Sequence, residues 1–401
     1  MVLKGVADLP LHEGRVPAHL FRRMLELGSV IARYIVEEFG PSELTERLAD
    51  PFWFQAFNNV IGMDWDSSGS TTVTLYVLKH VFPPEQIRDY ELAVIGGKGK
   101  DALNTPVEAK KLDGHVDVDV LVRVSRLAAK IDNVALQDGY QLYIHGLLVT
   151  LNEKTLIIQQ GMMPESRLAR RYHILLENPR EITCEKDPHK SVASLNIHPA
   201  LNLVDQASRE ARRAIVEVVS STPSESLLSD LARVNKMLKQ KGGILRFATG
   251  GAITRPFTQT PRGPDSYYRP VTKFETVARA AEILKKEAVK TFDDVLLAKG
   301  IGAETVRALA LVAHLICGYE PSFRDPTTHP LDPFIYSYAH GGKDGVPYRI
   351  RVSEMDKTIQ FFSQIVESLK TGQKEKTALA RNLSRFVEKL RIRGILPGVW
   401  D

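Results

Sequence analysis

The residues with the clearest potential for chemistry lie in two apolar stretches near the middle of the chain, within YQLYIHGLLVTLNEKTLIIQQGMM. We predict that this segment is a β-hairpin, with two strands around the turn Asn152-Glu153-Lys154. His145 stands in the first stretch, and Gln159 and Gln160 stand in the second. Asp138, just before the first stretch, adds a carboxylate that could act as a base or a metal ligand. We predict that these four residues form a catalytic set for phosphodiester chemistry, helped by Mg²⁺ or Mn²⁺ that neutralises charge on phosphate. The simpler alternative, favoured for His145 on the residues alone, is a hydrogen-bonded histidine within a sheet.

The spacing around His145 faintly resembles the phosphodiesterase motif of the phospholipase D family. In that motif a histidine attacks phosphorus, while a lysine and an asparagine hold the oxygens. Here Leu147 replaces the lysine and Asn152 replaces the aspartate, so the motif is degenerate. PD-(D/E)xK nucleases carry their acid and lysine on a similar hairpin, but this stretch has no (D/E)xK element.

A basic segment, RLARRYHILLENPRE, follows the second stretch. Arg170, Arg171 and His173 are interleaved with Tyr172, a pattern that suits phosphate contact and base stacking. We therefore predict a basic, nucleic-acid-binding edge directly after the second strand. A solvated helix face is the alternative for a run of this kind.

Two turns in the first half could hold phosphate. In DWDSSGSTT, the hydroxyls of Ser67 and Ser68 precede a predicted helix whose first amides are free to bind an anion. In GGKGK, Lys98 and Lys100 lie on a glycine turn after a predicted strand, although the segment does not match the Walker pattern. Simple helix capping and a solvated lysine turn are the alternatives.

The segment FDDVLLAKGIGAETVRALALVAHLI in the second half fits a helix-hairpin-helix motif. A short helix over 292–297 would enter the turn Gly300-Ile301-Gly302, with Ile301 filling the gap between the helices. The first amides of the next helix, which begins at Ala303, have no intrahelical partner and favour an anion. The turn is thus predicted to hold backbone phosphate regardless of base sequence, and a tight connection without a ligand is the alternative.

Some helix-hairpin-helix proteins are DNA glycosylases, and those with lyase activity carry a lysine where this chain has Glu304. This difference argues against a Schiff-base lyase. A monofunctional glycosylase, with Asp325 as its carboxylate, remains an alternative. In the later loop YSYAHGGKDGVPYRI, Lys343 is predicted to contact nucleic acid, unless the loop instead joins the two halves of the chain.

The order of predicted elements divides the chain into two domains. Helices and strands alternate up to about residue 180, which predicts an α+β or α/β domain over 1–200. The remainder, 201–401, shows no strong strand pattern and is predicted to be all-α. Its expected helices cover about 202–220, 223–240, 272–289, 303–317, 353–371 and 374–392, with a long glycine- and arginine-rich loop between the second and third.

Composition places few further limits on function. A net charge of +5 over 401 residues permits a polyanionic partner without requiring one. The two cysteines, far apart in the sequence, form neither a disulfide framework nor a zinc motif. The N-terminus has no apolar core of a secretory signal and the chain has no apolar run long enough to span a membrane, so we expect a cytoplasmic protein.

Several stretches together resemble one family over residues 5 to 365: GVADLPLHEG, DPFWFQAFNNVIGMDWDSSGSTT, GGKGK, QDGYQLYIHG, QQGMM with RRYH, and YSYAHGGKDGVPY. They are similar to the uncharacterised prokaryotic family called domain of unknown function 763, common in archaea and thermophilic bacteria. The resemblance implies a role in DNA metabolism or repair. We expect a protein that binds DNA or RNA, and a metal-dependent nuclease if it is an enzyme. An enzyme acting on a small phosphorylated molecule is the competing expectation.

Overall fold

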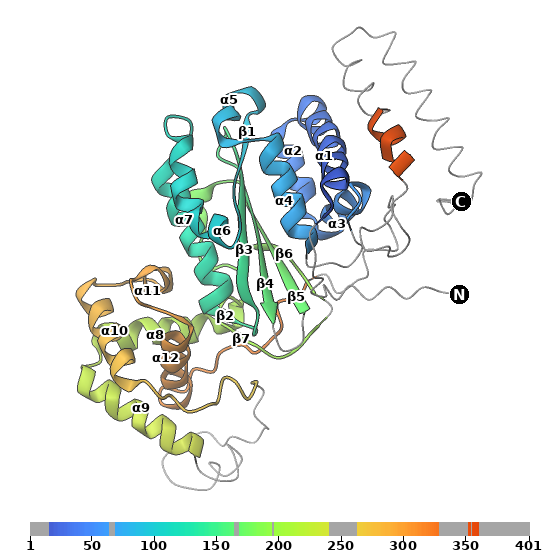
Figure 1. Cartoon of the computed structure of the whole chain (residues 1–401). Helices are drawn as coiled ribbons and strands as arrows, with labels where there is room; N and C mark the ends of the chain where they lie inside the picture. The colour runs from blue at the N-terminus through green and yellow to red at the C-terminus, as the bar shows by residue number, and fades with distance from the viewer. Residues whose placement is uncertain are drawn as a thin grey trace, which may run out of the picture.

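A five-stranded antiparallel β-sheet forms the centre of the computed structural model (Figure 1). The structure describes residues 16–63, 69–163, 168–194, 196–239, 263–328, 352–353 and 355–360. The strand order is β1-β3-β4-β5-β6. The bounds are β1 Leu92–Lys98, β3 Gln141–Thr150, β4 Thr155–Met163, β5 Leu168–Leu176 and β6 His189–Ala193.

The predicted hairpin is confirmed. Strands β3 and β4 pair antiparallel around the turn at residues 151–154, where Glu153 adopts a left-handed φ of 67°. In this register His145 lies opposite Gln159, and Ile144 lies opposite Gln160. Because side chains alternate along a strand, these two rows of residues point to opposite faces of the sheet.

One face of the sheet is covered by the first four helices, α1 Ala18–Phe39, α2 Pro41–Ala49, α3 Pro51–Val60 and α4 Gly69–Val81 (Figure 1). Local sequence sets these boundaries. Gly40, with a φ of 87°, separates α1 from α2, and the Asp50 side chain accepts hydrogen bonds from two amides of the first turn of α3. Apolar side chains of these helices pack on Val94, Ile144 and Leu148 of the sheet.

The other face carries α6 Lys100–Ala109 and α7 Val118–Lys130, and the C-terminal helices pack against α7 and the turn at residues 131–135. The C-terminal helices are α8 Arg209–Ser221, α9 Ser224–Lys239, α10 Phe274–Lys286, α11 Phe292–Leu297 and α12 Ala303–Leu315.

The short elements are η1 Pro84–Gln86, α5 Ile87–Tyr90, η2 Lys110–Leu112, the π-turn η3 Ile131–Ala135, β2 Leu136–Gln137, η4 Pro179–Glu181, β7 Leu201–Asn202 and η5 Gln206–Ser208. One hydrophobic core runs from the sheet through α7 into α8–α12.

The fold is therefore mixed α and β, with an N-terminal helical layer, an antiparallel sheet and then helices. The helices expected over 202–220, 223–240, 272–289 and 303–317 are present with shifted ends, and those expected over 353–392 lie almost wholly outside the described residues. One hydrophobic core includes residues from both sides of residue 200. The expected division into two domains at that residue stays a prediction. Within the described residues, no helix combines the length and apolar character needed to cross a membrane.

One sequence-based expectation is wrong. The segment around Arg170, Arg171 and His173 is neither a solvated helix face nor an exposed edge, because it forms β5, between β4 and β6. All three side chains are buried. The charges misled the prediction, whereas the β-branched and aromatic content of RRYHILL is typical of an inner strand.

Candidate functional site

The predicted site residues of the hairpin and β5 divide between the two faces of the sheet. His145, Gln159 and Arg170 point toward α7 and the segment after α12, where their hydrogen-bond partners lie. Gln160, Arg171 and His173 point toward α2, α3 and α4. The predicted catalytic and nucleic-acid-binding residues therefore do not form one groove.

On the first face, His145 belongs to a chain of buried hydrogen bonds. Its Nε2 lies 2.8 Å from Ser125 Oγ on α7, and its Nδ1 lies 2.8 Å from Gln159 Oε1. Because a carboxamide oxygen can only accept, Nδ1 carries the proton and Nε2 accepts from Ser125. Burial lowers the pKa of His145 to about 4, so the imidazole is neutral at physiological pH. These contacts are those of a structural histidine within the sheet.

Asp132 and His189 extend this chain. The Gln159 amide donates to Asp132 Oδ2, and Asp132 Oδ1 lies 2.6 Å from His189 Nε2. Asp187 Oδ1 lies 2.7 Å from His189 Nδ1. Although burial disfavours a charged imidazole, the two carboxylates raise the pKa of His189 to about 10. Burial also raises the pKa of Asp132, so the pair retains its proton across neutral pH.

This proton should make stability depend on alkaline pH. The folded-state pKa of His189 lies above its unfolded value, so its contribution is fully present below about pH 6.5 and is lost as pH rises through about 10. We expect the free energy of unfolding to fall by a few kcal/mol across that range, measured by urea denaturation at several pH values. His189→Gln should remove most of this slope. An unchanged slope in the variant would show that His189 does not hold the proton.

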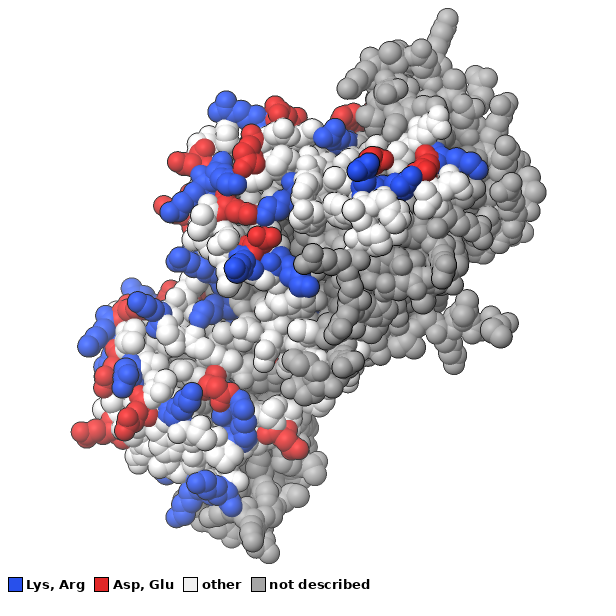
Figure 2. Space-filling model, viewed as in Figure 1, with Lys and Arg blue, Asp and Glu red and all other residues white. Residues whose placement is uncertain are grey.

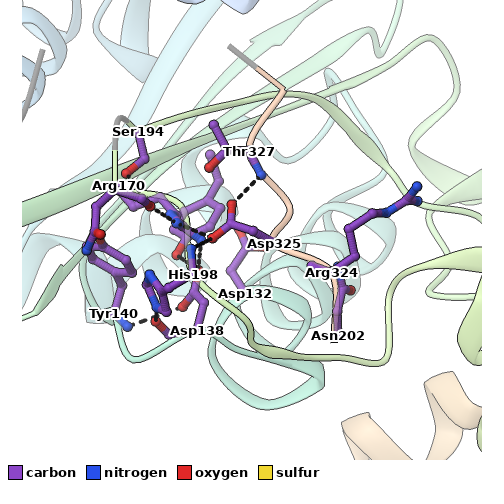
Figure 3. Close-up of polar contacts among 12 residues, drawn as sticks. Asp132, Asp138, Tyr140, Arg170, Ser194, His198, Asn202, Arg324, Asp325 and Thr327 are labelled. Carbon is purple, nitrogen blue, oxygen red and sulfur yellow. Dashed lines mark hydrogen bonds and ion pairs between the residues drawn. The ribbon is translucent and has the colours of Figure 1, made fainter. Parts of the chain in front are cut away.

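A second buried network surrounds Arg170 and Asp138 (Figure 3). Arg170 Nη1 lies 2.9 Å from Asp138 Oδ2, and Arg170 Nη2 lies 2.8 Å from Asp325 Oδ2. The Tyr172 hydroxyl donates to Asp138 over 2.7 Å, and the guanidinium stacks over the Tyr140 ring. Asp138, predicted to be a base or metal ligand, is thus held by a cation and a hydroxyl. Arg170 is correspondingly not placed to contact a phosphate.

Asp325 comes from the segment after α12, so this network joins the sheet to the C-terminal half. Its other oxygen, Oδ1, accepts from the Thr327 amide over 2.8 Å, and its Oδ2 also accepts from the His198 amide over 3.0 Å. Against the effect of burial, Arg170 lowers the pKa of Asp325. The carboxylate considered for a glycosylase is therefore an ionised partner of Arg170.

The opposite face carries the cluster Thr71, Tyr143, Gln160, Arg171 and His173, which we call the Arg171 cluster. Arg171 Nε donates to His173 Nε2 over 3.0 Å, and Nη1 donates to Thr71 Oγ1 over 3.3 Å. Thr71 donates to Gln160 Oε1 over 2.5 Å, and Gln160 Nε2 donates to the Tyr143 hydroxyl. Burial lowers the pKa of Arg171 to about 9.

Lys98 and Lys100, predicted to contact phosphate, are exposed at the end of β1 and the start of α6. Lys98 lies beside the Arg171 cluster, with its Nζ 5.7 Å from the centroid of the Tyr143 ring. Ser67, Ser68 and Lys343 lie outside the described residues.

The hairpin turn between α11 and α12 lies at the surface. Gly300 is exposed with a φ of 83°, and Ile301 is buried as the sequence predicted. Within the described part of the chain, no acceptor contacts the amides of Gly302, Ala303 and Glu304 at the start of α12. The Glu304 carboxylate pairs with Arg269 and with Arg307. The turn thus combines amides that have no acceptor among the described residues with an acid, Glu304, whose charge is already matched.

The sequence prediction missed a basic stripe on α7, formed by Arg123, Arg126 and Lys130. Arg123 and Arg126 are exposed and make no hydrogen bond or close ion pair among the described residues, although the charge of Arg123 helps to lower the pKa of Asp294 on α11. Lys130 Nζ donates to the Ile301 carbonyl, so the stripe ends at the hairpin turn. Figure 2 shows basic side chains gathered over the half of α7 nearer to α11. The spacing of three and four residues was visible in the sequence, but its link to the turn was not.

Among the described residues, no group of three or more His, Cys, Asp or Glu side chains is arranged to hold a metal ion. No curated protein and no solved structure matches the chain. The family model described as "Protein of unknown function (DUF763)" matches residues 5–350, and the chain therefore belongs to this family.

Proposed function

We propose that this protein binds the phosphate backbone of nucleic acid through a helix-hairpin-helix formed by α11, the turn and α12. The observation that carries the proposal is the exposed turn, where three adjacent amides lack an acceptor in the described part of the chain. Amides at a helix N-terminus are an anion site, because the helix dipole adds to their hydrogen bonds. A Cβ built at Gly300 or at Gly302 meets no atom within 4 Å, so a phosphate has room to approach.

The α7 stripe supports a polyanion rather than a single phosphate. It leads from the turn along one face of α7 for two helical turns, with Arg126 and Arg123 successively farther from Lys130. Such a row of cations matches a repeating phosphate backbone. Both the turn amides and the α7 stripe would contact only the phosphate backbone, so binding should be largely independent of base sequence.

The contacts of the predicted catalytic residues favour binding over phosphodiester cleavage. His145 is 7% exposed and accepts a hydrogen bond at the nitrogen that would attack phosphorus. Asp138 is bound by Arg170 and Tyr172. We therefore propose a role in DNA metabolism as a binding protein, with DNA or RNA as the partner.

The test compares the wild type with Gly302→Asp. Aspartate is a good N-cap residue, so this change should preserve the free energy of unfolding while its carboxylate occupies the turn amides and repels phosphate. We expect wild-type binding to duplex DNA to weaken at least about tenfold between about 50 mM and 200 mM salt. At the lower salt, Gly302→Asp should bind at least about tenfold more weakly than the wild type.

Fluorescence anisotropy with single-stranded, duplex and branched DNA and with RNA is a suitable measurement. Arg22→Gln is a matched control, because it removes one positive charge from an exposed position on α1, which covers the other face of the sheet. Binding that Gly302→Asp leaves intact would place the phosphate contact elsewhere. Absence of binding to all four ligands at low salt would refute the proposal.

A further inference from the structure

An open cavity of about 550 Å³ lies between α8 and the start of α11. Arg209, Arg213 and Glu217 line one side of it, because residues four apart share one face of a helix. Lys290 and Thr291, directly before α11, line the cavity as well. Cavities that bind small ligands measure about 300–1,000 Å³, so this one is large enough for such a ligand.

The end of the cavity at Glu185 is held by a buried arginine. Arg212, whose side chain is fully enclosed, donates to the carbonyls of Leu203, Asp205 and Glu185 over 2.8, 2.9 and 3.2 Å. Its Nη2 also lies 3.4 Å from Glu185 Oε2, and the Gln206 side chain donates to the Glu185 carbonyl over 2.7 Å. This wall is therefore preformed, and the charge of Glu185 is matched within it.

The other charged side chains of the cavity are mostly positive. Of those that line it, Arg209, Arg213 and Lys290 are cations and Glu217 is an acid. Arg213 also pairs with Glu210 over 3.1 Å, but these side chains are 57% and 59% exposed, so solvent screens the pair. Three cations around one hollow suit a phosphate group, whose oxygens accept several charge-assisted hydrogen bonds at once.

The first amides at α11 are already used, so an anion here depends on side chains. Asp294 Oδ2 accepts from the amides of Lys290 and Thr291 over 3.0 and 2.9 Å. The Thr291 hydroxyl accepts from the Asp294 amide over 3.2 Å. This capping box fixes the backbone of Lys290 beside the cavity.

The cavity also offers groups that match the rest of a nucleotide. The half-buried Val216 and the buried Phe292 line it, and these give a ring an apolar surface to pack against. The Glu217 carboxylate can accept hydrogen bonds from an amino group or from sugar hydroxyls. Cations, apolar surface and an acceptor in one cavity favour a nucleotide over a bare anion.

We propose that this cavity binds a nucleoside phosphate, with Arg209, Arg213 and Lys290 on the phosphate and Glu217 on the sugar or base. The ligand is either a free nucleotide or the phosphorylated end of a nucleic-acid strand, and the two share the same chemistry. The second case rests on the proposed function, because the strand would then be held at the hairpin turn as well.

The α7 stripe ends near this cavity. Against the effect of burial, hydrogen bonds from Lys290 and Thr291 and the nearby charge of Arg123 lower the pKa of Asp294. Lys130, at the opposite end of the stripe, donates to the Ile301 carbonyl in the hairpin turn. A strand bound along the stripe can therefore reach from the turn to the cavity.

The test compares two double variants. Arg209→Gln with Arg213→Gln removes two exposed cations of the cavity from α8, whereas Arg233→Gln with Lys236→Gln removes two exposed cations from α9, outside the cavity. The pairs are matched, because Arg213 and Arg233 each pair with an acid three residues earlier. Isothermal titration calorimetry with adenosine 5′-monophosphate (AMP) should give an affinity at least about tenfold lower for the α8 variant and an unchanged affinity for the α9 variant.

Glu217→Met tests the contact with the nucleoside. Because it removes a negative charge, inorganic phosphate should bind at least as tightly as to the wild type. AMP also loses a hydrogen-bond acceptor, so the ratio of AMP affinity to phosphate affinity should fall by at least about threefold. An unchanged ratio would show that the cavity recognises phosphate without the nucleoside.

An oligonucleotide with or without a 5′-phosphate distinguishes the two sources of the nucleotide. A gain in affinity from the 5′-phosphate that the α8 variant loses assigns the cavity to a strand end, and weaker AMP binding without such a gain assigns it to a free nucleotide. Gly302→Asp should leave AMP binding unchanged, so a failure of the hairpin function does not alter this result. If neither AMP nor the 5′-phosphate binds more weakly to the α8 variant than to the α9 variant, the proposal is wrong.

Discussion

Replacing Arg170 by methionine is expected to lower the free energy of unfolding by about 3–5 kcal/mol. The guanidinium is fully buried and pairs with Asp138 and Asp325, whose side chains are 0% and 6% exposed. Methionine fills much of the space but leaves two carboxylates with no cation. Removing one partner of a buried ion pair costs far more than the pair itself contributes, because an uncompensated charge remains.

The matched control is Arg180→Met. Arg180 also bridges two acids, Asp117 and Glu153, but its side chain is 48% exposed. Solvent screens this pair, so the same substitution should cost far less stability than Arg170→Met. Equilibrium urea denaturation measures both values. Adding Asp138→Asn and Asp325→Asn to Arg170→Met should restore much of the lost stability, and equal losses at Arg170 and Arg180 would contradict the assignment.

The parts of the fold that depend on local sequence were predictable. The hairpin follows from two β-rich runs around a polar turn, and the helices of the second half follow from apolar spacing and terminal glycines. The buried Ile301 between α11 and α12 also follows from local sequence. These features need no knowledge of distant contacts.

The division of the candidate site between two faces needed the strand register. Gln159 and Gln160 are adjacent in sequence, and the prediction placed them in one catalytic set. On a strand, neighbouring side chains point in opposite directions, so Gln159 reaches Asp132 while Gln160 reaches Thr71. His145 and Gln159 lie equally far from the centre of the turn, so their pairing across the two strands could be predicted from the sequence. The helices that cover each face of the sheet could not.

The partners of the buried charges could not be predicted. Arg170 and Asp325 are 155 residues apart, and their pairing depends on how the segment after α12 returns to the sheet. A sequence shows that RRYH is basic, yet it does not show that each charge is enclosed. For the same reason the sequence did not show that Lys130 donates to the carbonyl of Ile301, which lies 171 residues later in the chain.

Reversing two charges on the α7 stripe, by Arg123→Glu with Arg126→Glu, is expected to weaken duplex binding by about 100-fold or more at low salt. Each arginine that contacts a phosphate releases a counter-ion, so losing two contacts lowers the slope of log affinity against log salt by about 2. The added carboxylates also repel the backbone. Both positions are exposed on α7, away from its buried face of Leu121, Val124 and Leu127, so the fold should be unaffected.

This prediction separates a backbone path from a single phosphate contact. The matched control, Arg22→Glu with Lys190→Glu, makes the same change in net charge at exposed positions on α1 and β6. If only net charge mattered, control and stripe variants would weaken equally and the salt slope would fall alike in both. A path along α7 instead requires that the stripe variant lose more affinity than the control. It also requires that Gly302→Asp lower the affinity of the stripe variant by a smaller factor than it lowers that of the wild type, because both changes disrupt the same bound backbone.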